Sequence, residues 1–181
     1  MILYILRHAS AGTRRPNPLL DRKRGLDKEG KQQCLLIGAY LNAIGVNFDA
    51  ILSSPLKRSL QTASMVATEL GFDQKITADP SLEPSGRFAD FEALLSRYML
   101  MENVLVVGHN PNLAQYAGAL IGQRGTRANL RLRKAGLVRI DVSRRPAVLL
   151  TLTDVRLMQR FQASIVKGAK RKRTRKAKPH K

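Results

Sequence analysis

Short hydrophobic runs alternate along this chain with longer amphipathic segments. Nearly continuous apolar runs, which are typical of strands buried on both faces of a sheet, occupy residues 2–6, 48–52 and 104–107. Apolar residues recur at helical spacing in segments 28–44, 56–70, 88–100 and 113–121. Further short strands are expected at residues 75–78, 137–142 and 148–152. Because strands and helices alternate, the pattern predicts an α/β domain with a mostly parallel sheet.

The first strand and the first long helix are separated by a polar segment, residues 9–25, which has no periodicity. Its length is itself a hint of function, because long ordered loops in compact domains are usually functional. The helix that follows is expected to begin after Asp27, a suitable N-cap, and to end at Gly45. Its apolar residues are Leu36, Ala39, Tyr40, Ala43 and Ile44.

The charge of the chain adds a second feature. The 181 residues include 32 Lys and Arg against 13 Asp and Glu, a formal net charge of +19. Nine of the basic residues fall within residues 167–181, which contain no acidic residue, and residues 1–166 keep a net charge of +10. We therefore expect one folded domain over residues 1–160 and a disordered basic tail over residues 167–181. The tail suits weak, sequence-independent contact with nucleic acid or another polyanion.

Composition also excludes several classes of protein. No apolar run approaches the roughly 18 residues that a membrane span needs, so no membrane partner is expected. Arg7 and His8 interrupt the first apolar run too early for a signal peptide. The single cysteine, Cys34, excludes an internal disulfide and a cysteine-rich zinc site, and a cytoplasmic protein is expected.

Candidate chemistry lies where two of the buried runs end. His8 and His109 follow these runs directly, and the carboxyl ends of parallel strands form the edge at which α/β sheets bind ligands. Either histidine alone would be interpreted as a hydrogen-bonded residue that caps a strand. Together with Arg58, a few residues past the second run, they favour a phosphate site.

Arginines supply the anion-binding groups of such a site. The guanidinium groups of Arg7, Arg58 and Arg24 can bind a phosphate through two parallel hydrogen bonds. Their charge disfavours protonation of a neighbouring imidazole, which stays able to attack as a nucleophile. Phosphoryl transfer needs mainly charge neutralisation and in-line positioning. No Asp/Glu cluster with metal-ligand spacing is present, so a reaction without a metal or another cofactor is expected.

Four sequence blocks resemble the motifs of one enzyme family. In chain order they are Leu6-Arg7-His8-Ala9, the segment from Asp21 to Gly30, the segment from Ser53 to Ala63, and Val107-Gly108-His109-Asn110-Pro111. These blocks resemble those of the histidine phosphatase superfamily, in the family's own order. The resemblance implies a phosphoglycerate mutase-like fold, a three-layer α/β/α sandwich with a mostly parallel central sheet.

The chain is too short for the large cap insertions of phosphoglycerate mutases and phytases, and it looks most like the small SixA-type phosphohistidine phosphatases. The resemblance then implies that His8 is the nucleophile that becomes phosphorylated. Arg7, Arg58 and His109 would form the phosphate pocket around it. Arg24 would be a further phosphate contact.

The sequence departs from the wider family where a general acid is needed. Ser10 stands where many members have Glu, and Glu83 is the nearest candidate for the acid. An ordinary solvated loop carboxylate is an equally good interpretation of Glu83. A phosphoramidate needs a strong acid less than an alkyl ester does, because the leaving imidazole can be protonated directly.

Three functions stay open at this point. The first is a metal-independent phosphatase that acts on protein phosphohistidine, and the second is a broad phosphatase of small phosphomonoesters. The third is a polyanion-binding module recruited by its basic tail, although the intact histidines and arginines favour catalysis. Four other arginines could extend an anion-binding rim, but a solvated face is the simpler expectation for Arg124, Arg127, Arg131 and Arg133.

Overall fold

The computed structural model describes residues 1–123, 125–160 and 162–164, and every structural statement below concerns these residues. The strands are β1 (Ile2–Arg7), β2 (Ala50–Ser53), β3 (Thr77–Ala78), β4 (Asn103–Gly108), β5 (Leu137–Asp141) and β6 (Val148–Thr153). The helices are α1 (Pro18–Arg22), α2 (Lys28–Ala43), α3 (Lys57–Glu69), α4 (Phe88–Ser96) and α5 (Asn112–Ile121), with a 3₁₀ turn at Pro80–Leu82. Residues 155–160 are also helical.

The strands form one six-stranded sheet in the order β3-β2-β4-β1-β5-β6. Neighbours from β3 to β1 pair in parallel, whereas β5 and β6 pair antiparallel, so the mostly parallel sheet is confirmed. The two strands whose ends carry the histidines are direct neighbours, with Arg7 of β1 opposite Gly108 of β4. The carboxyl ends of β1 and β4 therefore meet at one edge of the sheet.

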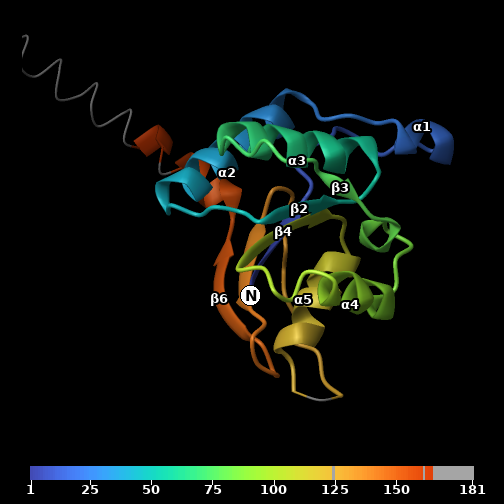
Figure 1. Ribbon diagram of the computed structural model, residues 1–181. Coiled ribbons are helices and arrows are strands. Elements are labelled where there is room, and N and C mark those ends of the chain that lie inside the picture. The colour runs from blue at the N-terminus through green and yellow to red at the C-terminus, as the bar shows by residue number, and fades with distance from the viewer. Residues whose placement is uncertain (124, 161, 165–181) are drawn as a thin grey trace, which may run out of the picture.

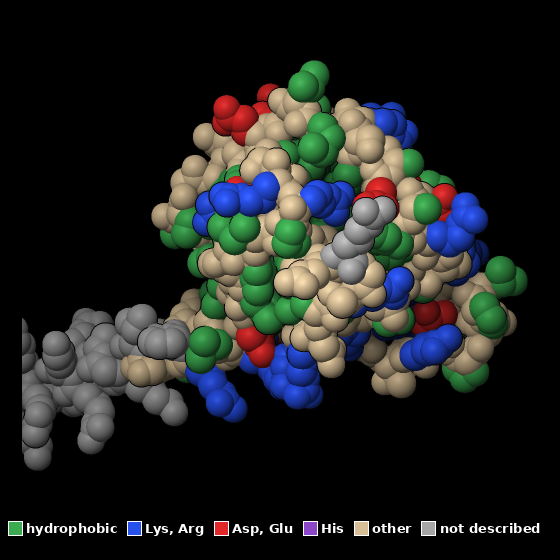
Figure 2. Space-filling view, turned by 90° about the horizontal axis from the view of Figure 1, so that it is seen from below, with side chains coloured by type: hydrophobic (Ala, Val, Ile, Leu, Met, Phe, Trp, Pro, Cys, Tyr) green, Lys and Arg blue, Asp and Glu red, His purple; other side chains and the backbone are tan. Residues whose placement is uncertain are grey.

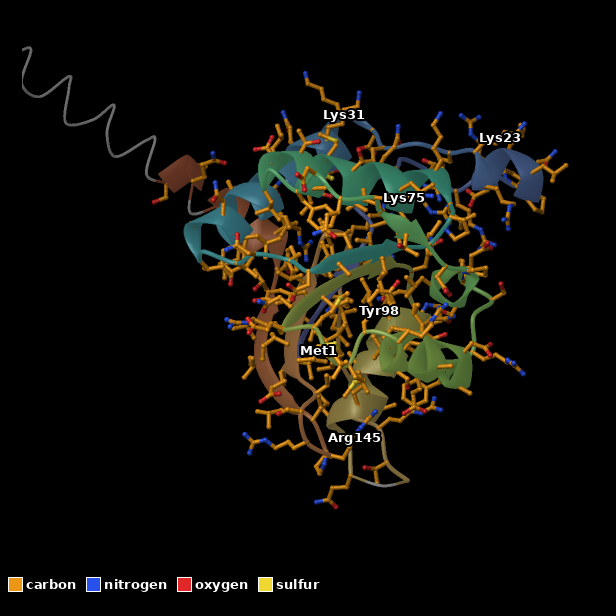
Figure 3. All side chains as sticks on the ribbon, in the orientation of Figure 1. Met1, Lys23, Lys31, Lys75, Tyr98 and Arg145 are labelled. Carbon is orange, nitrogen blue, oxygen red and sulfur yellow. The ribbon has the colours of Figure 1, made fainter. Side chains whose placement is uncertain are left out.

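Helices cover both faces of this sheet, which confirms the three-layer arrangement. Figure 1 shows α2 and α3 above the sheet and α4 and α5 below it. Alternate residues of β1 pack into the two layers: Leu3 and Ile5 join the core under α4 and α5, while Tyr4 and Leu6 join the core under α2 and α3. Side chains fill the space between the sheet and each helical layer (Figure 3).

The buried face of α2 differs from the one that its aliphatic residues suggest. Ala39, Ala43 and Ile44 are exposed, and the helix instead buries a face centred on Cys34, Ile37, Gly38 and Leu41. The reason is the close approach of α2 to its neighbours on that face. A Cβ atom at Gly38 would collide with the side chain of Glu69 on α3, so only glycine allows the two helices to pack this closely.

Two smaller differences concern the segments between strands. The polar segment 9–25 contains the short helix α1, which is capped by Asn17 through hydrogen bonds to the backbone N–H groups of Leu19 and Leu20. The helix expected at 88–100 ends at Ser96. Asp27 is the N-cap of α2, as predicted.

Within the described residues, no helix combines the length and the apolarity that crossing a membrane requires. The basic tail expected at residues 167–181 lies outside the described residues.

Candidate active site

The parallel pairing of β1 and β4 brings His8 and His109 together, although 100 residues separate them. The backbone N–H of His8 donates a hydrogen bond to the carbonyl oxygen of Gly108 (3.0 Å), and the two imidazole centroids lie 4.9 Å apart. His8 is 6% exposed and His109 is 2% exposed. In agreement with this burial, the face of the molecule in Figure 2 shows no histidine.

Hydrogen bonding fixes the tautomer of His8. Its Nδ1 lies 2.8 Å from the carbonyl oxygen of Ala9, which can only accept, so Nδ1 carries the proton and Nε2 carries the lone pair. Burial lowers the pKa of His8 to about 3, and the positive charges of Arg58, Arg7 and Arg24 act in the same direction. His8 is therefore neutral at physiological pH, with a nitrogen lone pair available for attack.

Serine hydroxyls hold the second imidazole. Nε2 of His109 lies 2.9 Å from the hydroxyl of Ser54, which follows β2, and 3.1 Å from the hydroxyl of Ser59 on α3. Burial lowers the pKa of His109 to about 2, helped by the nearby His8 and by the charge of Arg58. His109 is thus a neutral group that is fixed in orientation beside His8.

Asp21 organises two of the expected phosphate-binding arginines. Arg58, in the first turn of α3, donates a hydrogen bond to the backbone carbonyl of Asp21 (3.0 Å) and lies 3.5 Å from its carboxylate. Arg24 donates from Nε to the same carboxylate (2.9 Å). Burial opposes ionisation of Asp21, but hydrogen bonds from the Arg15 backbone and the Arg24 side chain lower its pKa, so it stays charged.

Arg7 projects from the last position of β1 and donates from Nη1 to the carbonyl of Leu132 (3.1 Å). The Nε groups of Arg7 and Arg58 are buried and have no hydrogen-bond partner among the described residues. A buried N–H without a partner is costly, and an anion between the guanidinium groups would satisfy such donors. The geometry therefore suits binding of a phosphate next to His8.

The structure brings Glu83 to the same edge of the sheet but pairs it with an arginine. Its two carboxylate oxygens accept hydrogen bonds from Arg22 at 3.0 and 3.2 Å. The side chain of Asn112 on α5 holds the Glu83 loop by donating to the carbonyl of Glu83 (3.1 Å). Glu83 follows Leu82, whose carbonyl packs against Gly108 at the end of β4. The carboxylate thus lies at the rim of the histidine site, in an ion pair.

Several supporting residues are absent from the sequence-based set. Asp21 holds the two arginines, and Ser54 and Ser59 hold His109. The hydroxyl of Thr62 accepts a hydrogen bond from the backbone N–H of Ala9 at 3.1 Å. All four residues lie inside the two middle sequence blocks. The blocks themselves were therefore the available signal, but only their arginines suggested a chemical role.

No group of three or more His, Cys, Asp or Glu side chains suited to hold a metal ion occurs in the part of the chain that the structure describes. Of the arginines expected on a solvated face, Arg127, Arg131 and Arg133 line an open cavity of about 1220 Å³ that Arg7 also lines. Arg124 lies outside the described residues.

Comparison with known proteins adds evidence about the family. Residues 3–84 match the family model described as histidine phosphatase superfamily (branch 1). An uncharacterized protein from Picosynechococcus sp. is 35% identical over 142 residues, which cover 76% of this chain and 83% of that protein.

Several phosphatases of solved structure have a similar fold. The structure of the protein histidine phosphatase SixA with tungstate superposes with a TM-score of 0.77 at 20% identity, over 87% of this chain and 99% of that one. A putative phosphohistidine phosphatase SixA from Agrobacterium tumefaciens gives 0.71 at 26% identity, over 84% and 97%. A putative α-ribazole-5′-phosphate phosphatase from Escherichia coli gives 0.69 at 21% identity, over 86% and 98%. The superpositions confirm a phosphoglycerate mutase-like fold.

Proposed function

This chain belongs to the histidine phosphatase superfamily, and on that premise we propose that it is a metal-independent phosphatase that hydrolyses protein phosphohistidine. The observation that carries the proposal is the state of His8, a buried neutral imidazole whose ring lies 4.9 Å from that of His109 and whose pKa is lowered further by the charges of Arg58 and Arg7. Nε2 is the atom that would receive the phosphoryl group.

The first step would transfer the phosphoryl group to the enzyme. Nε2 of His8 attacks phosphorus, an N–P bond forms, and the bond between phosphorus and the substrate imidazole breaks. The substrate ring leaves as a neutral imidazole because its other nitrogen carries a proton. Nδ1–H of phosphorylated His8 keeps its hydrogen bond to Ala9, which stabilises the positive ring.

The second step would return His8 to its neutral form. Water attacks phosphorus, the N–P bond to His8 breaks, and inorganic phosphate leaves after the water has lost its proton to solvent. Arg7 and Arg58 would neutralise the phosphoryl oxygens in both steps, and Arg24 would add positive charge close to His8. His109 would donate to a phosphoryl oxygen as charge develops there.

The pairing of Glu83 supports a phosphohistidine substrate. Both oxygens of the Glu83 carboxylate accept hydrogen bonds from Arg22, an arrangement that suits an anchor for Arg22 better than a group that gives a proton to a leaving alkoxide. An alkyl phosphate would need that proton, whereas a protonated imidazole leaves without it. In this proposal Glu83 holds Arg22 at the rim and is not required as a general acid for phosphohistidine.

One alternative has its own supporting observation. The similarity in fold to a putative α-ribazole-5′-phosphate phosphatase favours a small phosphomonoester as substrate. Against it stands the openness of the site: no cap insertion covers the sheet edge in the described residues, so a small substrate would stay solvated on one side. A phosphorylated side chain carried by another protein suits an open site better.

The deciding experiment compares substrates with chelator present. We expect kcat/KM for a phosphohistidine peptide to exceed that for a sugar phosphate and for a phosphoserine peptide by at least about tenfold, because their alkoxide leaving groups need a proton donor. Turnover of p-nitrophenyl phosphate, whose leaving group needs no proton, reports on the phosphate pocket alone. Equal values for the small esters would favour the alternative.

A labelling experiment tests the covalent step. Denatured enzyme from a reaction with radiolabelled substrate should carry an alkali-stable, acid-labile phosphate, and His8→Ala should carry none. His180→Ala, which changes the only histidine of the tail, is the matched control and should label like the wild type. Labelling of His8→Ala would refute the assignment of the nucleophile.

Two further expectations remain part of this proposal. The buried free thiol of Cys34 is compatible with a reducing cytoplasm.

The basic segment 167–181 would add weak, salt-sensitive contact with polyanions. A chain that ends at Val166 should keep turnover of a small substrate and lose salt-sensitive retention on heparin; unchanged retention would assign it to the basic body instead.

A further inference from the structure

An open cavity of about 1220 Å³ adjoins the histidine site. Arg7, Ser10 and Asn110 line it on the catalytic side, and residues 127–134 line it on the other side. Arg7 belongs to both places, because its backbone precedes His8 and its side chain reaches the wall of the cavity. A molecule bound in the cavity would therefore lie directly beside the phosphate site.

Residues 127–134, which we call the ledge, are held firmly although residues 126–133 form no helix or strand. The N–H of Ala128 donates to the carbonyl of Gly118 on α5 (3.0 Å). The carbonyl of Leu132 accepts from Arg7 (3.1 Å) and from the side chain of Asn110 (2.7 Å). The ledge is thus anchored by residues of the catalytic edge itself.

The charge of the cavity is predominantly positive. Arg127 and Arg131 are exposed and form no ion pair with any described residue. Arg133 and Arg156 share one carboxylate, that of Asp154, at 3.2 and 3.7 Å. The only carboxylate among the lining residues is Glu29, whose Oε1 accepts a hydrogen bond from Gln33 (2.9 Å).

The rest of the lining is apolar or neutral. Pro111, Ala114 and Leu130 form apolar parts of the wall between the charged groups. The volume exceeds the roughly 300–1000 Å³ of ordinary small-ligand pockets, and such an amphipathic wall fits a stretch of polypeptide better than a second small anion.

We propose that the ledge is a docking surface for an acidic segment of the phosphoprotein substrate, next to its phosphohistidine. This inference rests on the proposed function and specifies its substrate as an acidic protein. Arg127 and Arg131 would pair with Asp or Glu side chains of that segment, while Pro111 and Leu130 would contact its apolar atoms. Charge pairs at the rim of an interface mainly steer association, so the effect should appear in KM.

The test uses two phosphohistidine peptides of equal length, one flanked by Asp and Glu and the other by Asn and Gln. For the wild-type full chain at low salt, kcat/KM should be about tenfold higher for the acidic peptide, a difference that high salt should remove. The double variant Arg127→Glu/Arg131→Glu should lose this preference through a higher KM, with unchanged kcat and unchanged turnover of p-nitrophenyl phosphate.

A matched control keeps the same change in net charge. Its two positions are Lys75 and Arg144. Lys75, labelled in Figure 3, precedes β3, the strand at the opposite edge of the sheet from β6. Arg144 is an exposed residue between β5 and β6. Lys75→Glu/Arg144→Glu should retain the preference for the acidic peptide. An equal loss in this control would overturn the proposal, because the effect would then come from net charge alone.

Other outcomes separate this inference from the proposed function. Equal kcat/KM for both peptides in the wild type overturns the docking surface and leaves the phosphatase assignment intact. Failure to hydrolyse either peptide, with turnover of p-nitrophenyl phosphate, overturns the proposed substrate. The docking surface is then tested by a second measurement, in which the unphosphorylated acidic peptide should inhibit turnover of p-nitrophenyl phosphate. This inhibition should be weaker in the ledge variant, Arg127→Glu/Arg131→Glu. Stronger inhibition by a single-stranded oligonucleotide, abolished in the ledge variant, would overturn the assignment of a protein ligand.

Discussion

Replacing Asp21 with Asn tests how the arginines are positioned. The substitution removes the negative charge that lies 3.5 Å from Nη1 of Arg58 and 2.9 Å from Nε of Arg24, and it leaves the backbone carbonyl that Arg58 also contacts. Two effects then compete. The pocket becomes more positive, which favours phosphate, while both guanidinium groups lose the partner that holds them in place.

The structure indicates which effect is larger. At 3.5 Å, two unit charges at an effective dielectric constant of about 20 attract by about 5 kcal/mol, an upper limit for what the carboxylate contributes to fixing Arg58. The retained carbonyl contact reduces the net loss to that of one charge-assisted hydrogen bond, about 1.5–3 kcal/mol. Misplacement of a phosphate-binding group by a fraction of an ångström is costly in phosphoryl transfer. We therefore expect kcat/KM to fall by about 10- to 100-fold.

The assay is steady-state hydrolysis of p-nitrophenyl phosphate and of a phosphohistidine peptide, with thermal unfolding of each variant as a check on folding. Asp90→Asn is the matched control, because it breaks an exposed ion pair between Asp90 on α4 and Arg87, the N-cap of that helix, and should change kcat/KM by less than about twofold. Activity of Asp21→Asn equal to or above that of the wild type would show that net potential matters more than arginine position. That result would refute the reasoning.

Four further predictions follow from the geometry. The imidazole nitrogen signals of His8 should show the neutral Nδ1–H tautomer and should not titrate between about pH 8 and about pH 5, because burial lowers its pKa to about 3; a titration near about 6.5 would contradict this. The unfolded chain binds more protons than the native one between these pKa values, so the stability due to neutral His8 should be lost as pH falls from about 6.5 towards about 3, measured by urea unfolding. Ser59→Ala should lower kcat about tenfold by loosening His109, whereas Ser64→Ala on the exposed side of α3 should have no effect. Gly30→Ala should destabilise the fold by about 1–3 kcal/mol, because its Cβ would collide with the carbonyl of Ser10; unchanged stability would show that the loop after β1 can move aside.

The sequence was most informative about the sheet and the residues at its edge. The buried runs at β1 and β4 were visible because strands covered on both faces read as continuous apolar stretches. His8 and His109 were identified as candidates because each follows such a run. That β1 lies beside β4 could not be predicted from periodicity, because hydrophobic alternation contains no information about strand order.

The packing of α2 shows a second limit. Apolar residues predicted a helix correctly, but its buried face is decided by where the backbone can approach a neighbour. Gly38 faces α3 and Gly30 faces the loop after β1, and both positions are sterically closed to a larger residue. A prediction from hydrophobic spacing counts leucine and isoleucine as buried and ignores glycine. It therefore assigned Ile44 to the core, although the side chain of Ile44 is 42% exposed.

The residues that support the site escaped prediction for a related reason. Asp21 lies in a segment without periodicity, and its role depends on meeting Arg58, which lies 37 residues further along the chain. The ledge depends on still longer connections, because the carbonyl of Leu132 accepts a hydrogen bond from Arg7 across 125 residues. In the sequence, Arg127 and Arg131 therefore look like isolated surface cations. In the fold, the hydrogen bond between Arg7 and the carbonyl of Leu132 holds the ledge against the end of β1. Arg127 and Arg131 therefore line the same cavity as Arg7, the residue that precedes His8.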